Sequence, residues 1–319
     1  MAHISRLIEN RGMNPALIFS TVLFIAGFSL KAALVPFHAW LPDAHPSAPA
    51  PISAMLSGVL IKVLGIYALL RVGFNVFGVN QIFASVLIWL GACSMIIGAF
   101  LALGQWDYKR LLAYSSISQV GYIILSLGIG GAVIARGDSP WVASLAIMGG
   151  LFHLMNHASF KSLLFLSSGA IVYSAQTRDL KKMGGLCERM PITGFATNIG
   201  AFSISGIPPF NGFWSKLIIV VAAIQARYYL LAFLAVMVSI ITLAYYLKVQ
   251  RYALFGHLGE ALKNVKEVPA LMCFSMLFLV LLCVGMGFLL LPWPRGAVLK
   301  PAVEVLMRGT QYAGLILGR

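Results

Sequence analysis

Long apolar segments joined by short polar connections make up most of this chain. A hydrocarbon core about 30 Å thick needs roughly 20 consecutive apolar residues per helix. Eight segments meet that rule: about 16–36, 52–70, 82–103, 111–131, 143–172, 192–224, 228–250 and 269–291. The connections are too short to hold a soluble domain. The pattern predicts an all-α fold, a polytopic membrane helix bundle of about eight transmembrane helices.

Two of these segments carry signals that interrupt a helix. Segment 192–224 contains Gly206-Ile-Pro-Pro-Phe-Asn-Gly212 in its middle, and segment 16–36 runs into Val35-Pro-Phe-His-Ala-Trp40. Proline removes a backbone donor and glycine loosens the chain, so we expect discontinuous helices at both places. Paired interrupted helices in two parts of a membrane chain point to an ion or substrate site.

Composition excludes several other classes of protein. Of 319 residues, 60% are hydrophobic and 10% are charged, against about 45–50% and about 25% in soluble proteins. A soluble enzyme, a disordered protein and a disulfide scaffold are therefore excluded. The four cysteines show neither a C-x-x-C pair nor metal-ligand spacing, so we expect no cofactor and no metal in this chain. The first fourteen residues lack the pattern of a signal peptide.

The charge balance is strongly basic, with 23 Lys and Arg against 9 Asp and Glu. If the first span ends on side B, the internal loops of side B hold ten basic residues and those of side A hold three. Basic residues favour the cytoplasmic side, so side B is predicted to be cytoplasmic. Both termini lie on side A and are therefore predicted to lie outside, although six basic residues near the termini favour the opposite orientation. The basic residues are dispersed, so no nucleic-acid partner is expected. The tail after Pro294 is mildly amphipathic and is expected along the interface.

Four lysines fall inside the predicted spans: Lys31, Lys62, Lys161 and Lys216. Each costs about 2.5–3.5 kcal/mol at the centre of a membrane helix, so such residues usually have a function. Lys62 and Lys216 have an alternative, since a lysine near a helix end can extend its amino group to the headgroups. Lys161 lies mid-span, where that alternative is poor.

His153, His157 and Lys161 follow one another at intervals of four residues, which places them on one face of a helix. A single buried histidine is usually a core residue, but three titratable groups in one stripe suit a proton or cation path. All nine acidic residues map to loops or ends. Either the span lysines are mostly neutral, or another chain supplies their counter-ion.

Several motifs occur in a fixed order between residue 24 and about residue 225. They are Phe28-Ser-Leu-Lys-Ala-Ala-Leu-Val-Pro-Phe-His-Ala-Trp-Leu-Pro-Asp-Ala-His45, Asp107-Tyr-Lys-Arg-Leu-Leu-Ala-Tyr-Ser-Ser-Ile-Ser118, HLMNHASFKSLLFLSSGAI, TRDLKKMGGL and GIPPFNGFWSK. In these motifs the chain resembles the antiporter-like subunits of respiratory complex I. That family includes the membrane subunits of energy-converting hydrogenases and formate hydrogenlyase, and the large Mrp antiporter subunits. Lysine at 216 and the run GGLCERMP favour the hydrogenase type.

The resemblance implies which part of the family fold is present. Members have about fourteen helices with two inverted repeat units, and this chain resembles helices seven to fourteen. Residues 15–72 would be a remnant of the first unit, 82–250 the second five-helix unit, 269–291 the final helix and 295–319 a short tail. The glutamate that partners the equivalent of Lys31 belongs to the absent part.

The resemblance also implies roles for the buried residues. Lys31 and Lys62 match the lysines of the seventh and eighth helices, while His153, His157 and Lys161 match the central relay and Lys216 the terminal lysine or glutamate. These roles predict a proton-translocating subunit of a redox complex in the inner membrane, without a redox centre of its own. Its expected partners are other membrane subunits, including a chain that supplies the missing helices and a carboxylate. A sodium/proton antiporter subunit and a non-transporting assembly half are the alternatives.

Overall fold

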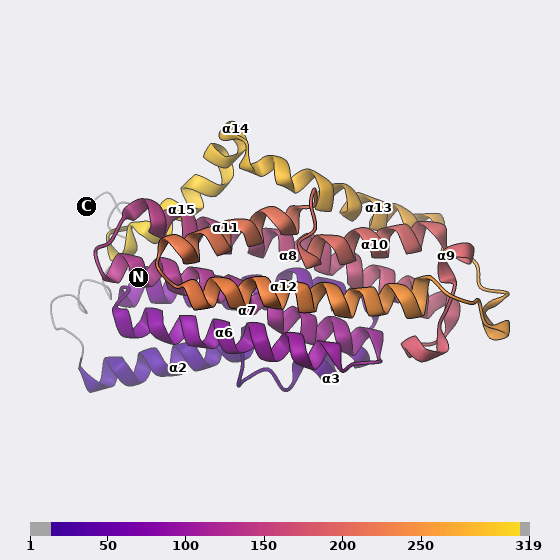
Figure 1. Cartoon of the computed structure of the whole chain (residues 1–319). Helices are drawn as coiled ribbons and strands as arrows, with labels where there is room; N and C mark the ends of the chain where they lie inside the picture. Colours follow the sequence, from indigo (N-terminus) through magenta and orange to yellow (C-terminus); the bar gives the residue numbers. More distant parts are fainter. Residues whose placement is uncertain (1–13, 313–319) are drawn as a thin grey trace.

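The computed structural model describes residues 14–312, and these residues fold into a bundle of helices that run roughly side by side (Figure 1). No β-strand occurs in this range. The eight predicted segments are present as α2 (Pro15–Ala32), the run α4 (Ala50–Met55), η1 (Leu56–Leu60), α5 (Ile61–Val72) and η2 (Gly73–Phe77), α6 (Gln81–Leu103), α7 (Tyr108–Ala135), α8 (Pro140–Ala175), the pair α10 (Pro191–Ser205) and α11 (Asn211–Gln225), α12 (Tyr229–Val249) with η4 (Gln250–Leu254), and α13 (Ala270–Gly285) with η6 (Met286–Leu290).

The connections hold only short helices, as expected for a chain without a soluble domain between its spans. They are α3 (Leu41–Ser47), η3 (Leu180–Lys182), α9 (Leu186–Arg189), η5 (Glu260–Leu262), α14 (Pro292–Pro294), η7 (Arg295–Leu299), α15 (Lys300–Met307) and η8 (Gly309–Gln311). Within residues 14–312, six helical runs are long and apolar enough to cross a membrane, and α11 is a shorter apolar helix. The prediction of a polytopic membrane helix bundle is confirmed.

The helix interruption predicted at residues 206–212 is confirmed. Helix α10 ends at Ser205, Gly206 takes the left-handed conformation with φ 81°, and α11 begins at Asn211. At the other predicted interruption, α2 ends at Ala32, earlier than the hydropathy pattern suggested. Ala33 adopts a left-handed φ of 60°, and its N–H donates to backbone carbonyls of the last helical turn, which closes the helix.

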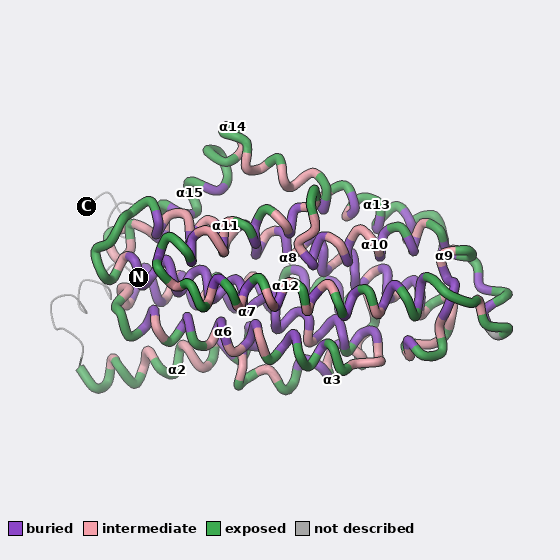
Figure 2. The backbone as a smooth tube through the Cα atoms, viewed as in Figure 1, coloured by how far each residue is buried: buried purple, intermediate pink, exposed green. Residues whose placement is uncertain are grey.

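Glycines allow a very close contact between α6 and α7. An added Cβ at Gly91 would lie 2.4 Å from the backbone nitrogen of Leu125, and one at Gly121 would lie 2.2 Å from that of Met95. Small residues let membrane helices approach closely enough for backbone atoms to pack. Helix α7 is consequently central, with 94% of its best apolar window buried, whereas α2 lies at an edge and is mostly exposed (Figure 2).

The described part of the tail folds back onto the bundle. In α15, Val303 and Leu306 are buried in the same apolar cluster as Phe74 of η2. The Asn75 side-chain amide donates to the backbone oxygens of Val305 and Gly309, both at 2.8 Å. The tail therefore packs against the end of the second span. Its predicted position along the membrane interface stays a prediction, and the outer face of α15 is the part that would lie there.

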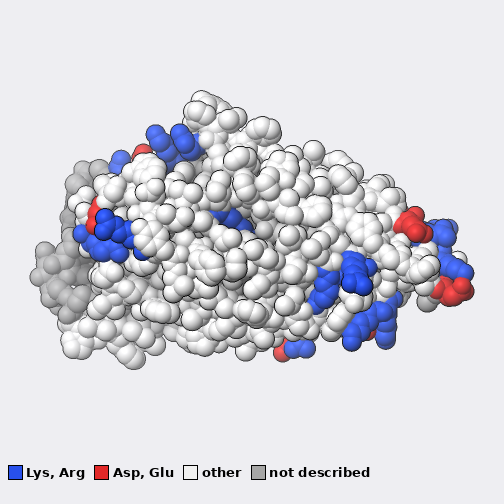
Figure 3. Space-filling model, viewed as in Figure 1, with Lys and Arg blue, Asp and Glu red and all other residues white. Residues whose placement is uncertain are grey.

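Charged side chains gather at the two ends of the molecule, with a nearly uncharged band between them (Figure 3). This distribution matches a protein that crosses a membrane along the long axis of its helices. Part of the predicted orientation rests on Arg6, Arg11 and Arg319, which lie outside the described residues. The cytoplasmic placement of side B therefore stays a prediction.

We expect Gly121→Ala to destabilise the bundle, because the new methyl group would meet the Met95 backbone, which cannot move without separating α6 from α7. Overpacking of this kind costs about 1–3 kcal/mol. Thermal unfolding in detergent measures the effect. Gly285→Ala is the matched control, since nothing lies within 4 Å of that added Cβ. Equal melting temperatures for the two variants would contradict the close contact.

Candidate functional site

Lys62 is the second residue of α5, which directly follows the π-helical turn η1, and it is fully buried. Its Nζ has no hydrogen-bond partner among the described residues. A π-helical turn shifts the following side chains around the helix axis, and such turns often occur at functional sites. The structure places the amino group inside the bundle, away from the surface, so the alternative of extension to the headgroups fails for Lys62.

Lys161 lies near the middle of α8 and is also fully buried. Its Nζ donates to the backbone oxygen of Leu112 in α7 at 2.8 Å. That oxygen also accepts from the Ser116 hydroxyl at 2.9 Å. Lys161 and Lys62 are close enough for electrostatic repulsion. Helix α7 thus supplies a backbone carbonyl to Lys161, which forms no ion pair with a carboxylate of the described residues.

The two histidines of α8 have different surroundings. The Nδ1 of His153 lies 2.8 Å from the Ser215 hydroxyl, and its Nε2 lies 3.2 Å from Oε1 of Gln119. Both ring nitrogens of His157 are buried without a hydrogen-bond partner in residues 14–312. His157 interacts electrostatically with Lys161, Lys62 and His153. It therefore lies between the lysine pair and the more fully hydrogen-bonded histidine.

Lys216 lies in α11, directly after the helix interruption. Its Nζ donates to the backbone oxygen of Ile204 at 2.8 Å and lies 4.8 Å from the centre of the Tyr122 ring. In a continuous helix the Ile204 oxygen would accept from residue 208, but Pro208 has no N–H. The interruption therefore leaves a free carbonyl at the negative end of α10 and gives a buried cation its ligand. Electrostatic interaction with His153 joins Lys216 to the same series.

Lys31 is not part of this cluster. It is exposed in the last turn of α2, and no hydrogen bond or ion pair of its side chain is found among the described residues. Only 11% of the α2 window is buried, the smallest share among the six candidate spans. The structure thus brings together Lys62, Lys161, His157, His153 and Lys216, which we call the buried polar line, and leaves Lys31 on an uncovered face.

Ion pairs within residues 14–312 involve none of the four span lysines. They join Arg110 to Asp43, Arg136 to Asp138, Arg178 to Asp107, Lys263 to Glu260 and Arg308 to Glu304. All lie in connections or at helix ends, where water screens their charges. Among the described residues, the hydrogen-bond partners of the buried polar line are therefore backbone carbonyl oxygens, a serine hydroxyl and a glutamine side-chain oxygen.

Sequence reasoning missed His45, which extends the line toward side B. His45 lies in α3, between two spans, and its buried ring lies 4.6 Å from the Phe165 ring, with neither nitrogen hydrogen-bonded in the described structure. It interacts electrostatically with Lys62, Lys161 and Lys109. Lys109, one of the ten basic residues that the sequence assigns to the loops of side B, is also buried, and its Nζ donates to the Ala48 oxygen at 2.8 Å. Nothing in the local pattern distinguishes these two from surface residues.

A membrane helix bundle with a broken helix and a buried line of lysines and histidines defines the class: a polytopic protein with titratable groups inside its spans. A family described as "NADH:quinone oxidoreductase/Mrp antiporter, TM" matches residues 1–242. The chain belongs to this family of antiporter-like membrane subunits.

Individual relatives come from different complexes. The chain is 43% identical over 209 residues to hydrogenase-4 component B of Escherichia coli (strain K12), a match that covers 64% of this chain and 31% of that protein. It is 36% identical over 287 residues to Na(+)/H(+) antiporter subunit A1 of Staphylococcus aureus (strain JH9), a match that covers 86% of this chain and 36% of that protein. A chain in the structure of the Mrp complex from Dietzia sp. DQ12-45-1b aligns over 93% of this chain and 60% of its own length, with a TM-score of 0.81 and 25% identity. This chain spans about a third of the curated relatives named here.

We expect His45 to make the stability of the protein fall with decreasing pH. Burial, with a smaller contribution from the charge of Lys62, lowers the pKa of His45 from 6.5 to about 3. Between these two pKa values, His45 is protonated in the unfolded chain and neutral in the folded chain. The stabilisation is therefore complete above pH 6.5 and is lost as pH falls toward 3, by up to about 1.4 kcal/mol per pH unit.

Thermal unfolding between pH 7 and pH 5 measures this dependence. His45→Gln cannot take up the proton, so its melting temperature should fall less than that of the unmodified protein. His257→Gln is the control, because that side chain is exposed. Identical pH slopes for the unmodified protein and His45→Gln would contradict the prediction.

Proposed function

We propose that this chain is a proton-translocating membrane subunit of a redox-driven complex of the hydrogenase or formate hydrogenlyase type. One observation carries the proposal: a series of buried amino and imidazole groups runs through α5, α8 and α11, and each interacts electrostatically with its neighbour. The 43% identity to a hydrogenase-4 component favours the hydrogenase type over NADH:quinone oxidoreductase.

In the proposed path, a proton from the cytoplasmic side reaches Lys62 and Lys161. It passes through His157 and His153 and leaves toward the outside by way of Lys216. Lysine and histidine suit this task, because both hold a proton reversibly, unlike arginine. Backbone carbonyls of Leu112 and Ile204 stabilise the ammonium forms without fixing them as a carboxylate would.

In this proposal, electron transfer on other subunits drives proton movement by changing the charge next to the buried polar line. Two positive charges on Lys62 and Lys161 repel each other, so a change of charge beside one moves a proton on the other. Lys31 acts as the gate between this chain and a neighbouring membrane subunit that supplies a carboxylate. The redox centres lie on other subunits, and the complex lies in the inner membrane with side B in the cytoplasm.

Sodium/proton exchange is the second candidate, because the chain is also similar to an Na(+)/H(+) antiporter subunit over 86% of its length. Sodium prefers several oxygen ligands, whereas the buried polar line is built from nitrogen groups. Proton movement alone therefore fits these residues better. Sodium-dependent proton release in vesicles that carry the purified complex would favour the antiporter.

We expect Lys161→Ala to lower proton pumping of the assembled complex by about a hundredfold, the low end of what a positioned proton-transfer group contributes. Lys161→Arg should fail as well, because it keeps the charge without releasing the proton. The measurement is acidification in vesicles, with electron transfer followed in parallel. Lys182→Ala, which alters an exposed lysine of η3, should pump normally.

Assembly and electron transfer distinguish a lost relay from a lost fold. If Lys161→Ala assembles, transfers electrons and pumps at the unmodified rate, the relay is wrong. If all four span lysines can be replaced by leucine or methionine without effect on pumping, the chain is a non-transporting assembly half.

We expect the exposed face of α2 to be covered by a neighbouring membrane chain. Gly27 lies one helical turn before Lys31 on the same face, with open space around it. A cysteine at this position should cross-link to that chain in native membranes with a short bifunctional thiol reagent. Phe274→Cys, on the exposed side of α13, is the matched control. A similar lack of cross-links at both positions would show that α2 faces lipid.

A further inference from the structure

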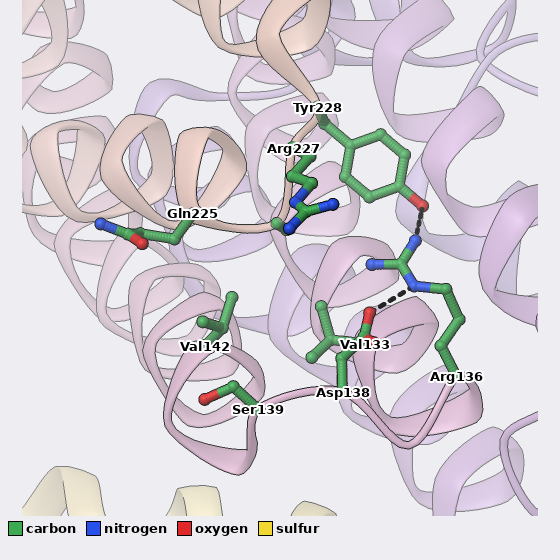
Figure 4. Close-up of a pocket in the computed structure, with 9 residues that line it drawn as sticks. Val133, Arg136, Asp138, Ser139, Val142, Gln225, Arg227 and Tyr228 are labelled. Carbon is green, nitrogen blue, oxygen red and sulfur yellow. Dashed lines mark hydrogen bonds and ion pairs between the residues drawn. The ribbon is translucent and has the colours of Figure 1, made fainter.

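A recess of about 540 Å³ opens at the end of the bundle opposite α3, where the α7–α8 and α11–α12 connections meet (Figure 4). Its walls come from Val133, Arg136, Asp138, Ser139, Val142, Gln225, Ala226, Arg227 and Tyr228. None of these residues belongs to the buried polar line. The recess lies where spans end, which is the depth of lipid headgroups.

The recess holds two guanidinium groups and only one carboxylate. Arg136 is engaged: its Nε lies 2.7 Å from Asp138, and its Nη1 donates to the Tyr228 hydroxyl at 3.0 Å. Arg227 extends into the opening (Figure 4), and no ion pair of its side chain is found among the described residues. The formal charge of the lining is therefore +1. The Ser139 hydroxyl does not cap α8, although Ser139 occupies its N-cap position.

An apolar groove of about 400 Å³ adjoins this recess and shares Arg227 and Tyr228 with it. The rest of its lining comes from α6 and α12, including Trp89 and Leu230, both 69% exposed. The groove therefore runs from the basic recess along the membrane-facing side of two spans. A positive recess continuous with an exposed apolar groove matches a molecule with an anionic head and a hydrocarbon tail.

We propose that this site binds an anionic glycerophospholipid, with its phosphate in the recess and an acyl chain in the groove. The planar guanidinium of Arg227 suits a phosphate oxygen pair, and the Tyr228 hydroxyl and Ser139 hydroxyl are further polar contacts. Arg136 stays paired with Asp138 and adds its remaining donors. The bound lipid would tie the α7–α8 connection to the α11–α12 connection.

Charge and shape together favour a lipid over a free anion. A free phosphate would use the recess alone, and a neutral lipid would use the groove alone. The surrounding bilayer presents phospholipids at high local concentration at this depth. The proposal is independent of the proton path, since it uses no residue of the buried polar line.

The test uses the protein purified in detergent with the subunits that accompany it. Native mass spectrometry counts bound lipid after addition of phosphatidylglycerol or phosphatidylcholine, and thermal unfolding measures stabilisation by each. We expect preferential retention of phosphatidylglycerol. Arg227→Gln should weaken that retention about tenfold, as loss of one charge-assisted contact predicts. Arg308→Gln, which removes an arginine outside both cavities, should behave like the unmodified protein.

Further arms separate the possible ligands. Ser85→Phe narrows the groove without changing charge, and it should reduce retention of phosphatidylglycerol as well. Inorganic phosphate or glycerol 3-phosphate should give little stabilisation. Equal stabilisation by these soluble anions, equal retention of the two lipids, or unchanged binding by both Arg227→Gln and Ser85→Phe would overturn the proposal.

Discussion

The amino groups of Lys62, Lys161 and Lys216 are buried inside this bundle and form no ion pair within the described residues, and much of the structure follows from how they are accommodated. Lys161 and Lys216 each donate to a backbone oxygen, on α7 and α10 respectively. Backbone oxygens are neutral dipoles, so they stabilise a cation less than a carboxylate would and also bind the neutral amine. Such groups can change protonation at lower cost than members of a tight ion pair.

The irregular backbone and the tight helix packing serve this accommodation. The interruption before α11 frees the Ile204 oxygen for Lys216, and the π-helical turn η1 precedes Lys62. The close approach of α6 to α7 at Gly121 keeps α7 in the middle, where its Leu112 oxygen faces α8. Helix breaks in an apolar interior are tolerated where side chains satisfy the freed backbone groups. Here Lys216 satisfies the freed Ile204 oxygen, whereas Nζ of Lys62 has no hydrogen-bond partner among the described residues.

The spans and the break in 192–224 were predictable from local sequence, because hydropathy and proline act within a few residues. Lys161 was equally visible as a cation mid-span. His45 was not, since a histidine next to Pro42 and Pro46 has the local pattern of a surface loop. Its burial arises from packing against Phe165, far away in sequence. The carbonyl partners and the glycine contacts likewise depend on which helices become neighbours.

Lys31 differs from the other span lysines in its surroundings. Helix α2 is the least covered of the six candidate spans, and Lys31 in its last turn is exposed. An exposed ammonium on an otherwise apolar helix is costly in a bilayer. Covering that face with a second chain that carries a carboxylate would remove the cost. The strength of such a charge pair would depend on the protonation of Lys31, so the contact between the two chains would itself respond to a nearby change of charge.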